Sequence, residues 1–222
     1  GIKISYVTNH AAREPAEVAG QIRSYGLPCR DDDVYTSAQS AARLLTDQLP
    51  RGARVLPIGG PGLRRALDAA VFELCSSAAE QPAAVVQGFW PELTWRDLAE
   101  AAYAINAGAL HLATNLDAAI PDARGIAPGN GALVNAVVAA TGKQPLASGK
   151  PRADIFQQAA RHNGARRPLV IGDRLDTDLQ GARAADMPGM LVLTGITGVH
   201  DAIEAPPAQR PSFVAADLRD LA

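Results

Sequence analysis

Short apolar runs rich in β-branched residues alternate with helix-forming segments along this chain of 222 residues. Residues 3–7 and 34–36 have the composition of strands. Helices are predicted after them, at residues 15–25 and from Ser37, as the capping residue, to about residue 49. Such an order favours parallel strands joined by helical crossovers. The pattern therefore predicts an α/β protein.

The same alternation continues to the end of the chain. Further strands are predicted at residues 54–58, 83–87, 110–113, 168–171, 190–193 and 213–214. Further helices are predicted at residues 63–70, 95–107, 132–141, 152–162 and 179–185. The middle section has enough elements to bury a core of its own. We therefore predict an inserted α/β domain at residues 51–145 and a core domain formed by residues 1–50 and 146–222.

Composition excludes several classes of protein. The formal net charge of −2 gives no electrostatic reason to expect nucleic acid or an anionic membrane as a partner. No apolar run approaches the roughly 18 residues that a membrane-spanning helix requires. The two cysteines, Cys29 and Cys75, are too few for a disulfide framework. These features predict a protein of a reducing, cytoplasmic compartment.

The strongest chemical motif is an apolar strand that runs into an acidic loop. Leu169 to Ile171 is followed by Asp173, Asp176 and Asp178. Ligands bind at the carboxyl ends of strands in parallel sheets, and magnesium prefers oxygen ligands. The array therefore indicates a metal site. Helix capping by Asp176 or Asp178 is the alternative, but it does not account for the whole array.

Two further motifs fit an anionic ligand. Lys150, followed by Pro151, precedes a predicted helix, whose free N–H groups favour a phosphate. Thr8 and Asn9 follow the first predicted strand, and a hydroxyl and an amide can bind phosphoryl oxygens. Taken singly, these motifs have simpler interpretations, namely a solvated lysine in a turn and a helix cap.

The glycines of the chain are less informative. Gly129 and Gly131, before the helix predicted at residues 132–141, could cradle an anion or simply form turns. The run Gly59-Gly60-Pro61-Gly62 is not a phosphate loop, because no Gly-Lys-Ser/Thr follows it. The four histidines lack metal-ligand spacing, and all except His10 are interpreted as ordinary surface or boundary residues.

The order of these motifs resembles the haloacid dehalogenase (HAD) phosphatases, in particular their subgroup with a large α/β cap. That subgroup includes 4-nitrophenyl, pyridoxal, phosphoglycolate and glycerol-3-phosphate phosphatases. The resemblance extends over essentially the whole chain and rests on Val7-Thr8-Asn9, Thr36-Ser37-Ala38-Gln39, Thr114-Asn115-Leu116-Asp117, Pro128-Gly129-Asn130-Gly131, Gly149-Lys150-Pro151 and Gly172-Asp173-Arg174-Leu175-Asp176-Thr177-Asp178. It implies a HAD-like Rossmannoid core with a parallel sheet and an inserted cap.

The resemblance also implies roles for individual residues. Asp173 would be a magnesium ligand, and Asp178 would help to hold the metal site. Lys150 would neutralise the nucleophile and the phosphoryl oxygens. Three consecutive residues and one cap residue would contact the substrate: Thr8, Asn9, His10 and Ile120. Histidine at position 10 departs from the asparagine or serine that is common there. A homodimer through the cap is compatible with the resemblance.

One family motif is missing from these 222 residues. HAD phosphatases carry an Asp-x-Asp-Gly-Thr segment on the central strand of the core, and this sequence has no such segment. Its first aspartate is the nucleophile and its second is the general acid/base. The chain by itself is therefore expected to lack the central strand and to be inactive.

Three functions are compatible with these observations. The first is a magnesium-dependent phosphatase that hydrolyses a small phosphomonoester through an aspartyl-phosphate. The second is a non-catalytic HAD-like protein that binds phosphate and magnesium. The third is a receiver-like signalling domain, against which the inserted section and the Thr-Asn motif argue. The sequence does not identify the substrate.

Overall fold

The computed structural model describes residues 2–221 and divides the chain into two compact units. One unit contains the residues up to Val7 and those from Lys150 onward, and the other is Thr8–Gly149. Gly1 and Ala222, the outer ends of the predicted core domain, lie outside the described residues. Parallel strands joined by helices confirm the α/β class. The domain boundaries at residues 50 and 146 stay a prediction.

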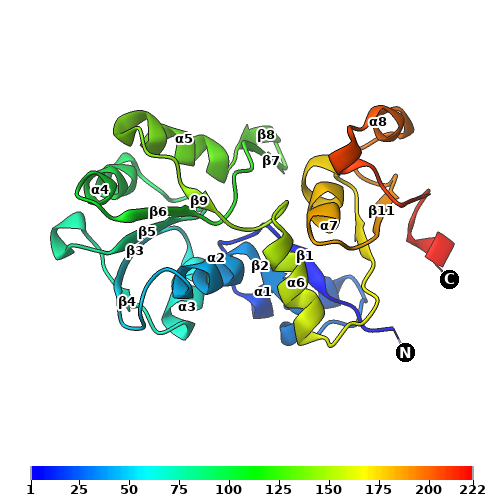
Figure 1. The fold of residues 1–222 in the computed structure, drawn as a ribbon, viewed down its shortest axis with the longest axis horizontal. Coiled ribbons are helices and arrows are strands. Elements are labelled where there is room, and N and C mark those ends of the chain that lie inside the picture. The colour runs from blue at the N-terminus through cyan, green and yellow to red at the C-terminus, as the bar shows by residue number, and fades with distance from the viewer. Residues whose placement is uncertain (1, 222) are drawn as a thin grey trace. The chain divides into compact units, whose positions relative to one another are not determined.

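The Thr8–Gly149 unit is built on a five-stranded parallel sheet (Figure 1). Its strand order is β4-β3-β5-β6-β9. In that order the strands are β4 (Glu73–Leu74), β3 (Arg54–Ile58), β5 (Ala84–Gln87), β6 (Leu110–Ala113) and β9 (Leu146–Ala147). The three longer strands were predicted, whereas the two-residue strands β4 and β9 were not.

Helices cover both faces of this sheet. On one face lie α2 (Ser37–Thr46) and α3 (Pro61–Ala69), which share a buried cluster with Val55, Val86 and Leu112. On the other lie α4 (Trp95–Asn106) and α5 (Asn130–Thr141), which share a cluster with Leu56, Ile58 and Val85. Successive strand residues point to opposite faces, which explains why the apolar strand runs are continuous. Because α2 contributes to the first cluster, residues before position 51 belong to this core.

The predicted start of α2 needs a correction. Its N-cap is Thr36, whose Oγ1 accepts the N–H of Gln39 at 3.3 Å, and not Ser37. The Gln39 side chain in turn accepts the N–H of Thr36 at 2.9 Å, which completes a capping box. Ser37 is therefore the first residue of the helix, and its hydroxyl is used elsewhere.

The remaining elements of this unit are short. They are α1 (Pro15–Ser24), β2 (Val34–Thr36), 3₁₀ turns at Asp31–Asp33 and Ala78–Glu80, and the strands β7 (Ala119–Asp122) and β8 (Gly125–Pro128). β7 and β8 form an antiparallel hairpin. No strand was predicted between residues 113 and 132, so this hairpin was missed.

The other unit has a three-stranded parallel sheet in the order β10-β11-β12. These strands are β10 (Val170–Gly172), β11 (Gly189–Val192) and β12 (Phe213–Ala215). Its helices are α6 (Ala153–His162), a π-helical turn (Leu175–Leu179), α7 (Gln180–Ala184), the unpredicted α8 (Val199–Glu204), and 3₁₀ turns at Pro207–Gln209 and Leu218–Leu221. The helix predicted from residue 152 begins one residue later, and Arg152 is its N-cap residue.

A small apolar core holds this unit together. Ile155, Phe156 and Ala185 are buried, and Val7 and Val170 pack against them. β1 (Tyr6–Thr8) spans the boundary between the two units. No helix among the described residues is long and apolar enough to cross a membrane.

Candidate active site

Lys150 and Asp178 form the most buried ion pair recorded among the described residues. Lys150 Nζ lies 2.7 Å from Asp178 Oδ1, and the two side chains are 17% and 8% exposed. Lys150 lies in the turn before α6, and Asp178 lies in the π-helical turn that follows β10. The structure therefore brings together the two residues for which a catalytic role was predicted.

The second carboxylate oxygen of Asp178 is held by the backbone. Asp178 Oδ2 accepts the N–H of Arg174 at 3.2 Å. A Cβ atom at Gly172 would lie 2.4 Å from Asp178 Cβ, so this carboxylate packs directly over the glycine. Gly172 is thus needed for close approach, a role that interior glycines of strands often have.

Asp173 has a different set of neighbours. Its Oδ2 accepts the N–H of Ile196 at 3.3 Å, and a Cβ at Gly195 would overlap that oxygen at 2.0 Å. Asp176, in contrast, points to Arg174, with Oδ2 2.7 Å from Nη2. Hydrogen bonding to the Arg174 guanidinium lowers the pKa of Asp176. The three carboxylates of the acidic motif are therefore held differently: Asp178 by Lys150 and the Arg174 backbone, Asp176 by the Arg174 side chain, and Asp173 by the Ile196 backbone.

The acidic motif could supply only some of the ligands of a magnesium ion. Among the described residues no group of three His, Cys, Asp or Glu side chains could hold a metal. Magnesium, however, often takes one or two protein carboxylates and completes its shell with water and substrate phosphate. Asp173 is a carboxylate at the carboxyl end of β10, and Asp178 is engaged by Lys150. Asp173 is therefore the better candidate ligand of the two.

The predicted phosphate-binding residues Thr8, Asn9 and His10 form a tight turn after β1. Thr8 Oγ1 accepts the N–H of His10 at 3.1 Å. The Nδ1 atom of His10 accepts the N–H of Ala12 at 3.2 Å, and Arg13 Nε lies 3.3 Å from its Nε2. Burial, and then the neighbouring charge of Arg13, lower the pKa of His10. His10 is thus held as a neutral ring that supports the turn.

Asn9 makes the longest-range contacts of the turn. Its backbone oxygen accepts hydrogen bonds from Ser37 Oγ at 2.7 Å and from Asn115 Nδ2 at 2.8 Å. Its side-chain amide donates to Asp117 Oδ2 at 3.1 Å. A Cβ at Gly149 would lie 2.7 Å from Asn9 Oδ1, and Gly149 has a positive φ of 72°. Sequence reasoning did not identify Asn115, Asp117 or Ser37 as partners of Asn9.

Gly129 and Gly131 have a packing role in the structure. A Cβ at Gly129 would lie 2.3 Å from the backbone oxygen of Asp117, and one at Gly131 would lie 2.4 Å from that of Leu116. The N–H of Gly131 is donated to the Asp117 carbonyl at 2.8 Å. Of the two interpretations of these glycines, the structure favours the one without a bound anion.

Ile120, the predicted substrate contact, lies on β7 and pairs with Ala127 of β8. It is half-buried, whereas most of the hairpin is exposed. Its contact with a substrate stays a prediction.

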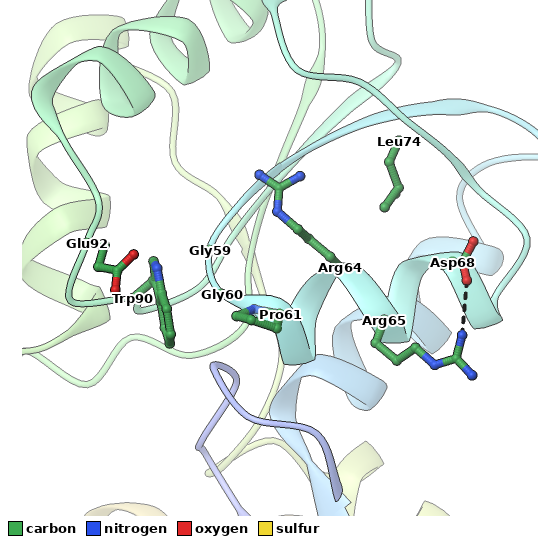
Figure 2. Close-up of a pocket in the computed structure, with 9 residues that line it drawn as sticks. All are labelled: Gly59, Gly60, Pro61, Arg64, Arg65, Asp68, Leu74, Trp90 and Glu92. Atoms are coloured by element: carbon green, nitrogen blue, oxygen red, sulfur yellow. Dashed lines mark hydrogen bonds and ion pairs between the residues drawn. The ribbon is translucent and has the colours of Figure 1, made fainter. Parts of the chain in front are cut away.

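A cavity of about 530 Å³ lies elsewhere in the Thr8–Gly149 unit (Figure 2). It lies by the turn that follows β3, between Trp90 and the N-terminal part of α3. Its lining residues are Gly59, Gly60, Pro61, Arg64, Arg65, Asp68, Leu74, Trp90 and Glu92. The N–H of Gly62, at the start of α3, is donated to the Ala12 carbonyl at 2.8 Å. The predicted site residues do not line this cavity.

Known proteins are similar to this chain over nearly its whole length, and two family models match its first and last thirds. A haloacid dehalogenase-like hydrolase model matches residues 1–73, and a HAD-hydrolase-like model matches residues 147–221. The D-glycerol 3-phosphate phosphatase of Mycobacterium tuberculosis is 45% identical over 97% of this chain. The chain spans only 61% of the length of that relative.

Two further comparisons agree with this. The acid sugar phosphatase of Staphylococcus saprophyticus is 35% identical over 97% of this chain and 82% of the relative. The crystal structure of a glycerol phosphate phosphatase from Mycobacterium tuberculosis, in complex with magnesium, superposes with a TM-score of 0.96. It shares 45% identity with this chain and covers 99% of it, and the chain covers 67% of that structure.

Proposed function

The chain belongs to the haloacid dehalogenase-like hydrolase family. From this premise we propose that it functions as a magnesium-dependent phosphatase that hydrolyses a small phosphomonoester. Two similar proteins act on glycerol 3-phosphate or on sugar phosphates, as their names state. The proposed substrates are glycerol 3-phosphate, phosphoglycolate, a sugar phosphate or 4-nitrophenyl phosphate. The proposed reaction passes through an aspartyl-phosphate.

The Lys150–Asp178 ion pair is the observation that carries the proposal. A mostly buried ammonium group held at 2.7 Å by a carboxylate has a fixed position. Such a group can neutralise phosphoryl oxygens without reorganising at the moment of reaction. We assign Lys150 this role and Asp178 the role of holding it. Asp178 would also support the metal site from outside the coordination shell.

The substrate contacts are assigned to Thr8, Asn9, His10, Lys150 and Ile120. Hydroxyl and amide groups donate to phosphoryl oxygens, which suits Thr8 and Asn9. His10, as a neutral ring with Nδ1 bound to the backbone, supports the turn that carries them. Ile120 would contact the non-phosphate part of a compact substrate.

Magnesium is the proposed cofactor, and Asp173 is its proposed ligand in this chain. When bound, the ion neutralises charge on the phosphoryl oxygens. A similar phosphatase was crystallised in complex with magnesium. Asp173 accepts only one backbone hydrogen bond among those recorded, from Ile196. That bond leaves its carboxylate with further lone pairs for a cation.

The proposed nucleophile is not among these residues, because the 222-residue sequence contains no Asp-x-Asp-Gly-Thr. A second candidate function is a HAD-like protein that binds phosphate and magnesium without turnover. We expect these 222 residues alone to release no phosphate, because an aspartyl-phosphate needs that carboxylate.

One experiment separates the two functions. Phosphate release from glycerol 3-phosphate and 4-nitrophenyl phosphate is measured with the 222-residue chain and with a form that carries an Asp-x-Asp-Gly-Thr segment before residue 1. The phosphatase proposal expects magnesium-dependent release from the extended form and its loss in Asp173→Asn. Phosphate binding without release by the extended form would favour the binding protein.

The state of the cysteines bears on the compartment in which the protein works. Cys29 and Cys75 are both free and buried, which suits a reducing, cytoplasmic compartment. A small phosphorylated metabolite is the expected partner, and a homodimer through the cap is proposed from the family resemblance alone.

A further inference from the structure

Asn115 uses both ends of its side-chain amide in the network around Asn9. Its Nδ2 donates to the Asn9 carbonyl at 2.8 Å, and its Oδ1 accepts the N–H of Asp117 at 3.1 Å. A carbonyl can only accept and an N–H can only donate, so the orientation of this amide is fixed. Asn115 is 4% exposed, which protects both bonds from competition by water.

Asp117 fixes the side chain of Asn9 in the same way. Its carboxylate can only accept, so Asn9 must turn Nδ2 and not Oδ1 towards it, as observed at 3.1 Å. The backbone oxygen of Asn9 is also held, by Ser37 and Asn115. Main chain and side chain of Asn9 are therefore fixed by groups far away in the sequence.

The segment that carries Asn115 and Asp117 is itself anchored on α5. Asn130 Nδ2 donates to the Asn115 carbonyl at 2.8 Å, and Asn130 is 1% exposed. The N–H groups of Gly129 and Gly131 are donated to the carbonyls of Ala118 and Asp117, at 2.9 and 2.8 Å. The close approach of both glycines holds this segment against the start of the helix.

We propose that Asn115 and Asp117 are positioning residues that fix the side-chain amide of Asn9 for a phosphoryl group. The proposal rests on the proposed function, in which Asn9 binds phosphate. Asp117 lies two residues before β7, so its carboxylate also ties Asn9 to the base of the hairpin that carries Ile120. Asp117 thus connects the turn that is proposed to bind phosphate with the hairpin that is proposed to contact the rest of the substrate.

Substitutions that either keep or remove the side-chain oxygen test this geometry. Asp117→Asn keeps an oxygen that can accept from Asn9, whereas Asp117→Ala removes it. Asn115→Asp replaces the donor that faces the Asn9 carbonyl by an acceptor, so that two oxygens meet. Asp122→Ala is the matched control, because Asp122 is an exposed carboxylate on the same hairpin and its recorded bond is to the N–H of Arg124.

The first measurement is independent of catalysis. The side-chain amide protons of Asn9 are observed by NMR in the 222-residue chain. We expect the proton that faces Asp117 to lose its downfield shift and its protection from exchange in Asp117→Ala. Asp117→Asn should retain most of both, and Asp122→Ala should change neither. An unchanged Asn9 amide in Asp117→Ala would overturn the proposal.

The second measurement is kinetic and uses the form extended by the Asp-x-Asp-Gly-Thr segment. Loss of a hydrogen bond to a charged group predicts that Asp117→Ala raises KM and the inhibition constant of inorganic phosphate by about tenfold. The rate constant kcat should change less, Asp117→Asn should recover most of the affinity, and Asn115→Asp should weaken phosphate inhibition at least as much.

The two measurements distinguish failure of the proposal from failure of the proposed function. Equal phosphate inhibition in Asp117→Ala and the unaltered protein would overturn the positioning role even if the NMR signal changed. An unaltered extended form without phosphatase activity would contradict the proposed function. In that case the NMR result alone decides whether Asn115 and Asp117 hold Asn9.

Discussion

Lys150 and Asp178, separated by 28 positions in the sequence, form an ion pair of 2.7 Å that water reaches only slightly. The other oxygen of Asp178 accepts the N–H of Arg174, and its side chain packs over Gly172. The carboxylate therefore has a fixed place before any ligand arrives. Since burial of two charges is costly unless they are paired, the pair has measurable consequences for stability.

Removal of one partner should destabilise the protein strongly. Asp178→Ala would leave the Lys150 ammonium group buried without its carboxylate, at a cost of about 3 kcal/mol. The control Asp176→Ala removes an ion pair whose carboxylate is 58% exposed, at a cost below about 1 kcal/mol. Urea unfolding measures both, and equal losses in the two variants would contradict the assignment. The pair Lys150→Met with Asp178→Leu should recover most of the loss.

Two glycine-to-alanine substitutions should change the stability of the protein in opposite directions. At Gly172 a Cβ would lie 2.4 Å from Asp178, so Gly172→Ala should destabilise by about 1–3 kcal/mol. At Gly20, inside α1, the nearest atom is Arg23 Nη2 at 3.9 Å, so Gly20→Ala should stabilise by about 0.5–1 kcal/mol. Thermal unfolding of both variants checks the signs. A stabilised Gly172→Ala would show that Asp178 does not need this space.

Stability should decrease in mildly acidic solution because of His10 and His111. Burial is the main cause that lowers the pKa of each below the ordinary value of 6.5. Below that pH the unfolded chain takes up protons that the folded protein resists, so the free energy of unfolding falls with falling pH. Above pH 6.5 the full stability is present.

The measurement is the urea midpoint at pH 7.5 and at pH 5.5. It should be lower at pH 5.5, and the difference should shrink in His111→Gln, where the buried ring is replaced. A midpoint that stays constant or rises on acidification would contradict the prediction.

Gly60→Ala should displace Trp90 at the cavity shown in Figure 2. A Cβ at Gly60 would lie 2.6 Å from Cε3 of the indole ring, so the ring must move or the turn must open, at about 1–3 kcal/mol. The chain has two tryptophans, and Trp95 is 76% exposed. In a Trp95→Phe background the emission maximum of Trp90 should therefore shift and its quenching by acrylamide should increase. Unaltered fluorescence would contradict the prediction, because it would mean that the added methyl group does not displace the Trp90 ring.

Local chemistry explains what could be predicted from the sequence. The apolar run that ends in Gly172-Asp173 predicted a strand within two residues of its observed position. The helix from Trp95 begins after Thr94, whose N–H is accepted by Asp97 as in a capping box. Such features depend on neighbours within four positions, which a single sequence displays.

The missed features depend on residues that are distant in the sequence. The Asn9–Asp117 bond joins positions 108 apart, and neither residue type by itself indicates its partner. The role of Gly131 depends on the Leu116 carbonyl, which lies against it only in the folded chain. β4 and β9 have two residues each, too few to give a period. In each case tertiary contacts and not local propensity determine the structure.

Strands β7 and β8 pair with each other in a sheet of their own, and most of their residues are exposed. Substitutions in this hairpin consequently carry little thermodynamic penalty for folding. Sequence drift among homologues should therefore concentrate between Ala119 and Pro128, while Asn115, Gly129 and Gly131 on either side resist change. A new preference for a different phosphorylated compound could then evolve within ten residues, with the rest of the protein left as it is.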